Sequence, residues 1–522
     1  MASKVNLDAL IRREDFEVEN VSSSRTGTDT MTIRLEDLKK DSFFFSAIRK
    51  PDFQRETNEW GPEKIARLIE SYVTGDLIPA VILWQNGSFT FVIDGSHRLS
   101  ALAAWVNDDY GDGGISKTFY DGEIPEDQIK IAERSRIIVR KLVGAYSDHI
   151  LAITNPEKVN PLIVARARDL GRLAIQLQWV KGDASKAEES FFKINQEASP
   201  IDKTESVLLK QRRKPNCMAA RAIRRSGTGH KYWSAFTQEK QEAIEKLAKE
   251  INDLFFIPPL KTPIKTLDLP VAGRLYSSQT LPLILNFVNI VNGIGEKETE
   301  AIPEDNDGEM TLQCLNSCRH IALRINSSDS GSLGLHPAVY LYSKDGLYKV
   351  ASFYAVIALI LEFEKNKELI KDFIDVRRNF EELLLEYDYF ISQIVRKYRF
   401  AIMSYPHVKD YYIFLLEALK KNLSKDQTIA ELLKNPKYSY LTTQQIEAKD
   451  DIEIGKDFPE KVKSEVFMTE ALTASLRCKI CGGYIHKNSI SIDHKMRKED
   501  GGFGTLDNAQ ITHPYCNTTY KQ

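Results

Sequence analysis

The sequence predicts an α+β multidomain protein with an N-terminal α/β module, a helical middle domain and a small metal-stabilised C-terminal domain. Its 522 residues are too many for one hydrophobic core. With 42% hydrophobic and 28% charged residues, the composition is that of a globular protein. The boundaries that we expect are a flexible arm over residues 1–30, a module over 31–210, a helical domain over 211–460 and a terminal domain over 465–522.

Charge and cysteine usage limit the class of protein. The formal net charge is -2, so contacts with nucleic acid must come from local basic patches. Six cysteines in so long a chain do not form a disulfide framework and indicate a reducing compartment. The first residues lack the apolar core of a signal peptide, and no apolar run is long enough for a membrane span. We therefore expect a cytoplasmic protein without a membrane contact.

The module alternates helices and short strands. Pro62 marks a helix start, Gly75 ends that helix, and Asn86-Gly87 forms the turn of a hairpin. The predicted strands cover residues 78–84 and 89–93, helices cover 96–106 and 187–194, and a loop covers 195–200. The arm is inferred from the polar run Ser22–Thr28.

The middle of the chain reads as long helices. The clearest is a single helix over residues 366–399, in which apolar residues recur every three, four or seven positions. Plain core packing is the simplest explanation of that stripe. The charged segment 449–463, with Gly455 and Pro459, marks the last domain boundary.

Two ligand pairs near the end of the chain predict a structural zinc site. Cys478 and Cys481 form one pair, His513 and Cys516 the other, and each pair is separated by two residues. Three thiolates and one imidazole are a closed tetrahedral zinc set. The alternative is a chance grouping of thiols in a reduced protein, which the paired spacing disfavours. Zinc would also explain how so short a segment folds.

Between the two pairs lies a strand-like segment, 489–494, that ends in Asp493-His494. A glycine loop and Asn508 follow, and Asn517 comes directly after the second ligand pair. This order over about forty residues resembles the HNH nuclease family in its zinc-containing ββα-metal form. Asn517 stands where the family name implies a last histidine. His486 is outside the pattern and is expected on the surface.

Phosphodiester hydrolysis explains these residue types. A neutral imidazole such as His494 can take a proton from water. Asp493 offers a hard oxygen to Mg²⁺ or Mn²⁺. The resemblance implies that Asn517 supplies a second metal ligand and that Asn508 orders the loop that holds His494. The alternative is a zinc finger without catalysis, which would not need Asp493, His494 and the two asparagines.

A second group of candidates lies at a strand-to-helix junction in the module. Asp94, Gly95, Ser96, His97 and Arg98 place a carboxylate, a glycine turn and an arginine beside a helix start, where an anion is favoured. Taken alone, a simple helix cap is the more frequent explanation of an Asp-Gly turn.

Neighbouring segments give this junction more weight. Gln54-Arg55 lies upstream, and Phe191-Phe192-Lys193-Ile194-Asn195 lies downstream. Together with the Asp94–Arg98 segment they resemble the ParB/sulfiredoxin-like module of modification-dependent restriction proteins of the GmrS and SspE type, over about residues 35–210. The resemblance implies a nucleotide triphosphate site that includes Gln54, Arg55, residues 94–98 and Asn195. The chain has Ser96-His97 where that family usually has Gln-Gln, which leaves hydrolysis and nucleotide preference open.

The leading hypothesis is a metal-dependent HNH endonuclease that cuts DNA under control of a nucleotide-binding module, in restriction or antiphage defence against modified or foreign DNA. Two alternatives remain: a DNA-binding regulator without catalysis, and an NTPase with a vestigial nuclease domain. The sequence leaves open a homo-oligomer, the DNA modification that is read, and whether one or both strands are cut.

Overall fold

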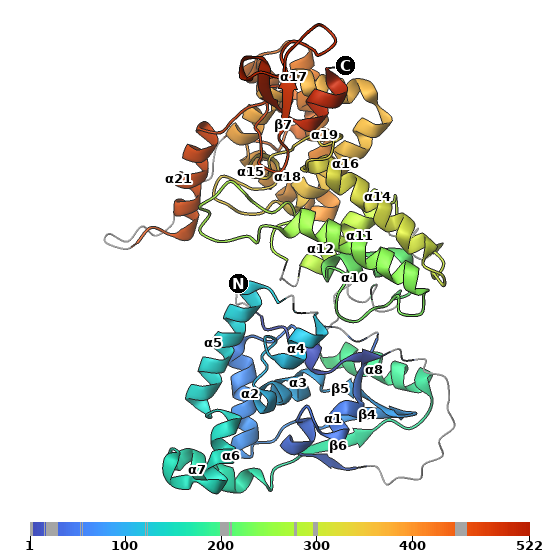
Figure 1. Ribbon diagram of the computed structural model, residues 1–522, viewed down its shortest axis with the longest axis vertical. Coiled ribbons are helices and arrows are strands. Elements are labelled where there is room, and N and C mark those ends of the chain that lie inside the picture. The colour runs from blue at the N-terminus through green and yellow to red at the C-terminus, as the bar shows by residue number, and fades with distance from the viewer. Residues whose placement is uncertain are drawn as a thin grey trace. The chain divides into compact units, whose positions relative to one another are not determined.

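The computed structural model describes residues 4–14, 16, 30–52, 54, 56–120, 122, 124–198, 208, 211–275, 279–295, 301–443 and 457–521. The chain divides into two compact units. The N-terminal unit comprises residues 1–218, 228–235 and 276–278, and the C-terminal unit comprises 219–227, 236–275 and 279–522. Figure 1 shows the two units in blue to green and in green to red. No helix in the described segments is both long and apolar enough to span a membrane.

The N-terminal unit is built on a mixed six-stranded sheet. Its order is β1 (Arg13–Glu14), β3 (Ile48–Pro51), β5 (Phe89–Asp94), β4 (Val81–Asn86), β6 (Ile175–Trp179) and β2 (Thr32–Ile33). Strands β4 and β5 pair as an antiparallel hairpin, whereas β3 runs parallel to β5 and β6 parallel to β4. The predicted hairpin around Asn86-Gly87 is therefore confirmed, with Gly87 in the left-handed region.

Helices cover both faces of this sheet. The side chains of β5, which alternate between the two faces, therefore point into two different cores. Val92 points into the larger core with α2 (Pro62–Thr74), α3 (Ser96–Asn107) and α5 (Glu126–Leu142). Phe91 and Ile93 point into a smaller core under α8 (Ala184–Ala198) (Figure 1). The remaining helices of the unit are α1 (Phe43–Ala47), α4 (Gly114–Phe119), α6 (Tyr146–Thr154) and α7 (Pro161–Leu170). Helix α10 (Pro215–Arg224) follows them.

Two expectations for this unit need correction. Residues 4–14 do not belong to a flexible arm, because Val5, Leu7 and Leu10 are buried in the larger core. The run Ser22–Thr28 on which that expectation rested lies outside the described residues. The loop expected at 195–200 is also wrong over residues 195–198, where α8 continues. A polar sequence at a helix end was mistaken for a turn.

The N-terminal strand is anchored by a buried charge cluster. The Asp8 carboxylate, which is fully buried, pairs with the Arg13 guanidinium and with Lys50 Nζ at 2.7 Å. Lys50 also donates to Thr57 Oγ1 at 3.0 Å, and Arg13 donates to the Gln54 carbonyl at 3.2 Å. Buried charges need such complete pairing. The cluster thereby fixes the backbone at Gln54, beside β3.

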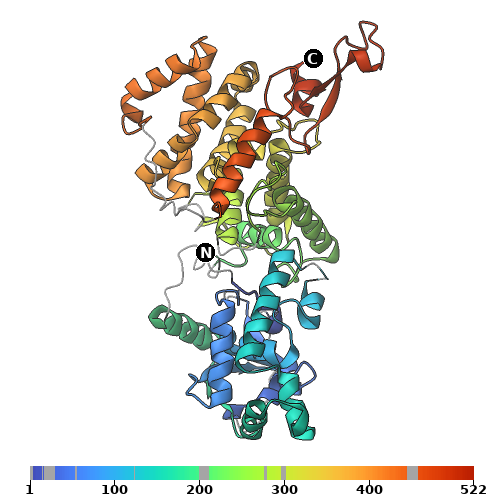
Figure 2. The same ribbon diagram turned by 90° about the vertical axis from the view of Figure 1, so that its left-hand side faces the viewer.

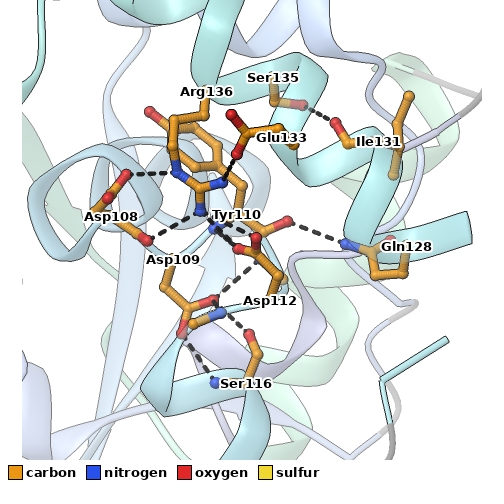
Figure 3. A network of polar contacts seen from close by, with 12 residues as sticks. Asp108, Asp109, Tyr110, Asp112, Ser116, Gln128, Ile131, Glu133, Ser135 and Arg136 are labelled. Carbon is orange, nitrogen blue, oxygen red and sulfur yellow. Dashed lines mark hydrogen bonds and ion pairs between the residues drawn. The ribbon is translucent and has the colours of Figure 1, made fainter. Parts of the chain in front are cut away.

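The loop that connects α3 to α4 is organised around Asp109 (Figure 3). This carboxylate, 1% exposed, accepts the backbone N–H groups of Gly111, Gly113 and Ser116 at 2.9 to 3.1 Å. It also accepts the Ser116 hydroxyl at 2.7 Å. A side chain at position 113 would clash, since an added Cβ would lie 2.7 Å from Asp109 Cγ.

Helix α5 holds the same loop from outside. Arg136 pairs with Asp108 and with Asp112, each at 2.9 Å, and Gln128 Nε2 donates to the Tyr110 carbonyl at 3.0 Å (Figure 3). The carboxylates raise the pKa of Arg136 against the opposing effect of its burial. The loop therefore ties the end of α3 to α5 and holds α3 in place.

The C-terminal unit is a helical body around α16 (Val350–Lys365), which is apolar on nearly all sides and packs against α12, α14, α17 and α19. Its helices are α11 (Gln238–Phe256), α12 (Thr280–Val291), α14 (Glu309–Ile325), α15 (Pro337–Tyr340), α17 (Lys367–Glu386), α18 (Tyr389–Tyr398), α19 (Ala401–Lys420), α20 (Lys425–Lys434) and α21 (Glu460–Thr473). The expected single helix over 366–399 breaks between α17 and α18. The Asp388 carboxylate accepts the Lys344 N–H at 3.1 Å there.

Helix α21 leads into the last part of the chain (Figure 2). Strand β7 (Ser491–His494) pairs with β8 (Ala509–Thr512) in an antiparallel ribbon. The 3₁₀ turn η5 (Leu506–Asn508) precedes β8, and the π-helical turn η6 (Cys516–Tyr520) follows it. This segment lies in the same compact unit as the helices.

We predict that Asp109→Asn destabilises the N-terminal unit by about 2 kcal/mol, because an amide replaces a buried anion that accepts four hydrogen bonds. Urea unfolding followed by tryptophan fluorescence measures this unit selectively, since all five tryptophans lie in it. Exposed Asp41→Asn is the matched control and should change stability by less than about 0.5 kcal/mol. Equal midpoints for the two variants would contradict the role of Asp109.

Candidate active site

Four ligand side chains converge in the C-terminal segment. The ligand atoms of Cys478, Cys481, His513 and Cys516 all lie within 4.8 Å of one another, and all four residues are buried. The first pair sits on a tight knuckle, in which the Cys478 carbonyl accepts the Gly482 N–H at 2.9 Å and Gly482 has a positive φ. The predicted cluster thus brings together two ligand pairs that lie 35 positions apart in the chain.

The donor set fits a single tetrahedral ion. His513 Nε2 lies 3.0 Å from the Tyr484 carbonyl, a hydrogen bond that needs the proton on Nε2. The lone pair of Nδ1 then faces the sulfurs of Cys481 and Cys516, at 3.4 and 3.9 Å. Such a second bond to a ligating imidazole fixes its tautomer and ring orientation. This is the arrangement that a structural zinc ion requires.

The groups of the cluster do not share one protonation state: burial raises the pKa of Cys481, and hydrogen bonds with the other two thiols raise the pKa of Cys516. Hydrogen bonds with the thiols of Cys481 and Cys516 lower the pKa of Cys478. Burial lowers the pKa of His513, which favours the neutral imidazole. Metal ligation needs a thiolate and a neutral imidazole.

Strand β7 delivers the predicted Asp493 and His494 at its end. Asp493 is 5% exposed and accepts Gln510 Nε2 and Lys521 Nζ, both at 2.7 Å and both on Oδ2. Within the described segments Oδ1 accepts no hydrogen bond. The half-buried ring of His494 has no hydrogen-bond partner among the described residues. One carboxylate oxygen and one imidazole are therefore available at the end of this strand.

The two asparagines hold the surrounding loops. Asn508 Oδ1 accepts the Met496 N–H at 2.7 Å, and its Nδ2 donates to the carbonyls of Met496 and Phe503 at 3.2 and 2.8 Å. The loop that follows His494 is thereby closed. Asn517 Nδ2 donates to Ser491 Oγ at 2.7 Å and to the Ile492 carbonyl at 3.3 Å. This brings Asn517 onto β7, and its Oδ1 accepts no hydrogen bond from the described residues.

Several participants were missed or misplaced by the sequence. Gln510 and Lys521 contact Asp493, although only the strand register that pairs Asp493 with Gln510 could have indicated this. His486 is 3% exposed and not on the surface, because its Nδ1 lies 2.8 Å from Asn326 Nδ2. Burial lowers its pKa to about 4. Arg377 of α17, which belongs to no recognisable motif, contacts His513.

The candidates of the N-terminal unit meet at the start of α3. Asp94 ends β5 and pairs with Arg98 at 2.8 Å, and Arg98 also donates to the Ala80 carbonyl at 3.1 Å. Gly95 has φ +100°, and a Cβ there would lie 2.8 Å from Val81 Cγ2. The helix cap that we weighed for Asp94 is not formed, since Gly95 is the N-cap residue and no side chain caps the helix.

The other candidates differ in how well they are placed. Ser96 is buried in the first turn of α3, and the His97 ring stacks on Trp60 with 5.5 Å between ring centroids. Gln54 is 5% exposed, its Nε2 lies 3.5 Å from the Ile93 carbonyl, and its Oε1 has no partner among the described residues. Arg55 lies outside the described residues, and of Asn195 only its place in α8 is described.

Comparisons with known proteins find matches for two parts of the chain. Residues 35–301, more than half of the chain, match the family model of the GmrSD restriction endonuclease, N-terminal domain. Residues 478–522 match the model of the HNH endonuclease. No curated protein and no solved structure gave a match. The first match contains the Asp94–Arg98 junction, and the second contains every C-terminal candidate.

Proposed function

Since the chain belongs to the family of the GmrSD restriction endonuclease N-terminal domain and ends in an HNH endonuclease domain, we propose that it is a metal-dependent DNA endonuclease gated by a nucleotide. The observation that carries the proposal is the end of β7. Asp493 and His494 are presented there with one carboxylate oxygen and one imidazole that have no hydrogen-bond partner among the described residues, beside a Cys3His cluster that would serve as scaffold.

The proposed roles follow from the contacts of each side chain. His494 takes the proton of the attacking water, because its ring bonds to no other group in the described part of the chain. Asp493 Oδ1 and Asn517 Oδ1 would hold Mg²⁺ or Mn²⁺, and Asn508 keeps the loop after His494 closed. The bound divalent ion would neutralise the phosphate and stabilise the leaving 3′ oxygen. Gln510 and Lys521 orient the Asp493 carboxylate through Oδ2.

Zinc would take no part in that chemistry. Its four ligands fill a tetrahedral shell, so no position is left for water or substrate. We propose zinc as the folding element of residues 465–522 and the harder ion as the cofactor of cleavage.

We predict that His494→Ala lowers the rate of plasmid cleavage in Mg²⁺ or Mn²⁺ by about 10²- to 10⁴-fold, as expected for loss of a general base. The zinc content should be unchanged, because His494 is not among the four clustered ligands. His320→Ala, an exposed histidine on α14, is the matched control and should cleave like the wild type. Cleavage by His494→Ala at the wild-type rate would refute the role of His494.

For the N-terminal unit we propose nucleotide triphosphate binding at the start of α3. The N–H groups of the first turn of α3 and the Arg98 fork favour phosphate oxygens. Gln54 Oε1, which is buried and has no partner among the residues that the structure describes, offers an acceptor beside β5. The Trp60–His97 stack supplies a flat aromatic surface close to this helix start. Arg55 and Asn195 remain in the proposed site because they belong to the two segments, Gln54-Arg55 and 191–195, on which the resemblance to the ParB/sulfiredoxin-like module rests.

The proposal gives each region a task. Residues 31–210, together with residues 4–14, would form the nucleotide-binding module, residues 211–460 the helical domain and residues 465–522 the nuclease. A protein of this kind would act in the cytoplasm against modified or foreign DNA, as in restriction or antiphage defence. Release of phosphate without DNA cleavage would instead support an NTPase with an inactive nuclease domain.

We predict that Arg98→Met weakens nucleotide triphosphate binding to the full-length chain by roughly 10- to 100-fold, the effect of losing a charged hydrogen bond to phosphate. Isothermal titration with each of the four common ribonucleoside triphosphates measures this. Arg67→Met, an exposed arginine on α2, is the control and should bind like the wild type. Equal affinity of Arg98→Met and wild type for every nucleotide that binds would place the site elsewhere.

A further inference from the structure

We propose that Arg377 of helix α17 is a positioning residue of the zinc centre. Its guanidinium supplies the counter-charge of that centre from the helical body, outside the segment that matches the HNH endonuclease. The inference rests on the zinc site proposed above and extends it to a residue 101 positions before the first ligand. It also explains how a small nuclease segment is held on a large helical unit.

Arg377 is completely buried, and each edge of its guanidinium has a partner. Nε donates to Glu381 Oε1 at 2.7 Å. Nη1 donates to the Leu333 carbonyl at 2.6 Å, and Nη2 donates to the Gly334 carbonyl at 2.9 Å. Nη1 also lies 3.2 Å from Nδ1 of His513, the nitrogen that faces the thiols. The guanidinium therefore abuts the ligand shell itself.

Glu381 completes the link from α17 to the knuckle. Its Oε1 accepts the Tyr340 hydroxyl at 2.9 Å, and its Oε2 accepts the Tyr484 N–H at 2.7 Å. The Tyr484 carbonyl is the group that orients His513. Glu381 thus holds the peptide of Tyr484 through its N–H, and that peptide orients His513 through its carbonyl, while Arg377 lies beside the same imidazole.

Charge explains why an arginine is needed there. Three thiolates, one neutral imidazole and Zn²⁺ carry a net charge of minus one, and a buried anion is costly without a cation nearby. The Arg377 charge interacts with Cys481 and Cys516 as well as with Glu381. Arg377 Nη1 lies 3.2 Å from His513 Nδ1, so the guanidinium places a full positive charge directly beside the ligand cluster.

The backbone leaves room for this contact at two glycines. At Gly483 an added Cβ would lie 2.3 Å from Arg377 Nε. At Gly334, where φ is +60°, an added Cβ would lie 2.4 Å from His513 Cδ2. Glycine at both positions lets the knuckle and the loop before α15 approach α17 closely. The backbone at these two glycines therefore packs directly against the side chains of Arg377 and His513.

Further bonds place the whole nuclease segment on the helical body. The Tyr515 N–H donates to the Ser332 carbonyl at 3.1 Å, and the Tyr515 ring lies 5.2 Å from the Arg324 guanidinium. Thr518 Oγ1 donates to the Ser330 carbonyl at 2.8 Å. Zinc loading and docking on α17 are therefore one coupled event, and the nuclease is not a freely tethered domain.

The test compares zinc binding by four full-length variants. Arg377→Met/Glu381→Gln removes the counter-charge without leaving an isolated buried charge. Glu381→Gln alone keeps the arginine. Arg378→Met, whose side chain is 67% exposed on the same helix, is the matched control. Cys481→Ser, which removes a ligand, is the reference for a broken site. The readouts are zinc affinity, by competition with a chromophoric chelator, and the thiolate-to-metal absorption of the Co²⁺-substituted protein.

We predict a 10- to 100-fold loss of zinc affinity for the double variant, the usual effect of removing a residue that supports metal ligands. Its Co²⁺ absorption should shift, because the charge beside the thiolates is lost. Glu381→Gln should lose less zinc affinity than the double variant, because it keeps the positive charge beside the thiolates, and Arg378→Met should keep the wild-type affinity. A purely structural role of the pair would instead weaken zinc binding equally in Glu381→Gln and in the double variant, and that result would overturn the inference.

Two further outcomes are informative. If circular dichroism shows the double variant unfolded, Arg377→Lys decides, since it keeps the charge but loses the guanidinium fork. A Co²⁺ spectrum and zinc affinity close to wild type in this variant support the counter-charge, whereas a loss of zinc as large as in Cys481→Ser would overturn the inference. If the wild-type chain itself binds no zinc, the zinc centre proposed above fails, whereas zinc binding by wild type with unchanged double-variant affinity refutes the role of Arg377 alone.

Discussion

The convergence of Cys478, Cys481, His513 and Cys516 is the contact on which the nuclease segment depends. Besides these ligands, few large apolar side chains of the segment are buried, among them Tyr484 and Ile485. Ile492, Phe503 and Leu506 are exposed by 61%, 78% and 89%. So little apolar burial cannot order the backbone alone, and a bound ion would supply the missing free energy of folding.

The same constraint places the catalytic candidates. Strand β8 ends at Thr512, directly before the ligand His513, and β7 is paired with β8, so the position of the cluster fixes the position of Asp493 and His494. Asn517 follows the ligand Cys516 directly and returns to β7 through its amide. The zinc ligands and the catalytic candidates are therefore different residues that the β7–β8 ribbon joins, because Gln510, the register partner of Asp493, lies three positions before His513. The buried Arg377–Glu381 pair extends that connection to the helical body.

The sequence predicted what short-range pattern and chemistry determine. The Cys-x-x-Cys knuckle, the Asp94–Arg98 junction and the β4–β5 hairpin each depend on residues close in the chain. Long-range contacts carried no such signal: Arg377 meets His513 across 136 positions, and His486 meets Asn326 across 160. Residues 4–14 could not be placed for the same reason, because their partners, the carbonyls of Thr57 and Trp60 and strand β3, lie more than thirty positions later.

The central claim is that zinc orders the domain and a second, harder divalent ion enables cleavage. The most direct measurement is plasmid cleavage by zinc-loaded protein that has been freed of other divalent ions, as Mg²⁺ or Mn²⁺ is titrated back. The account predicts no cleavage at the start and a saturable rise while the zinc content stays constant. Cleavage at full rate before any ion is added, with zinc as the one metal present, would contradict it.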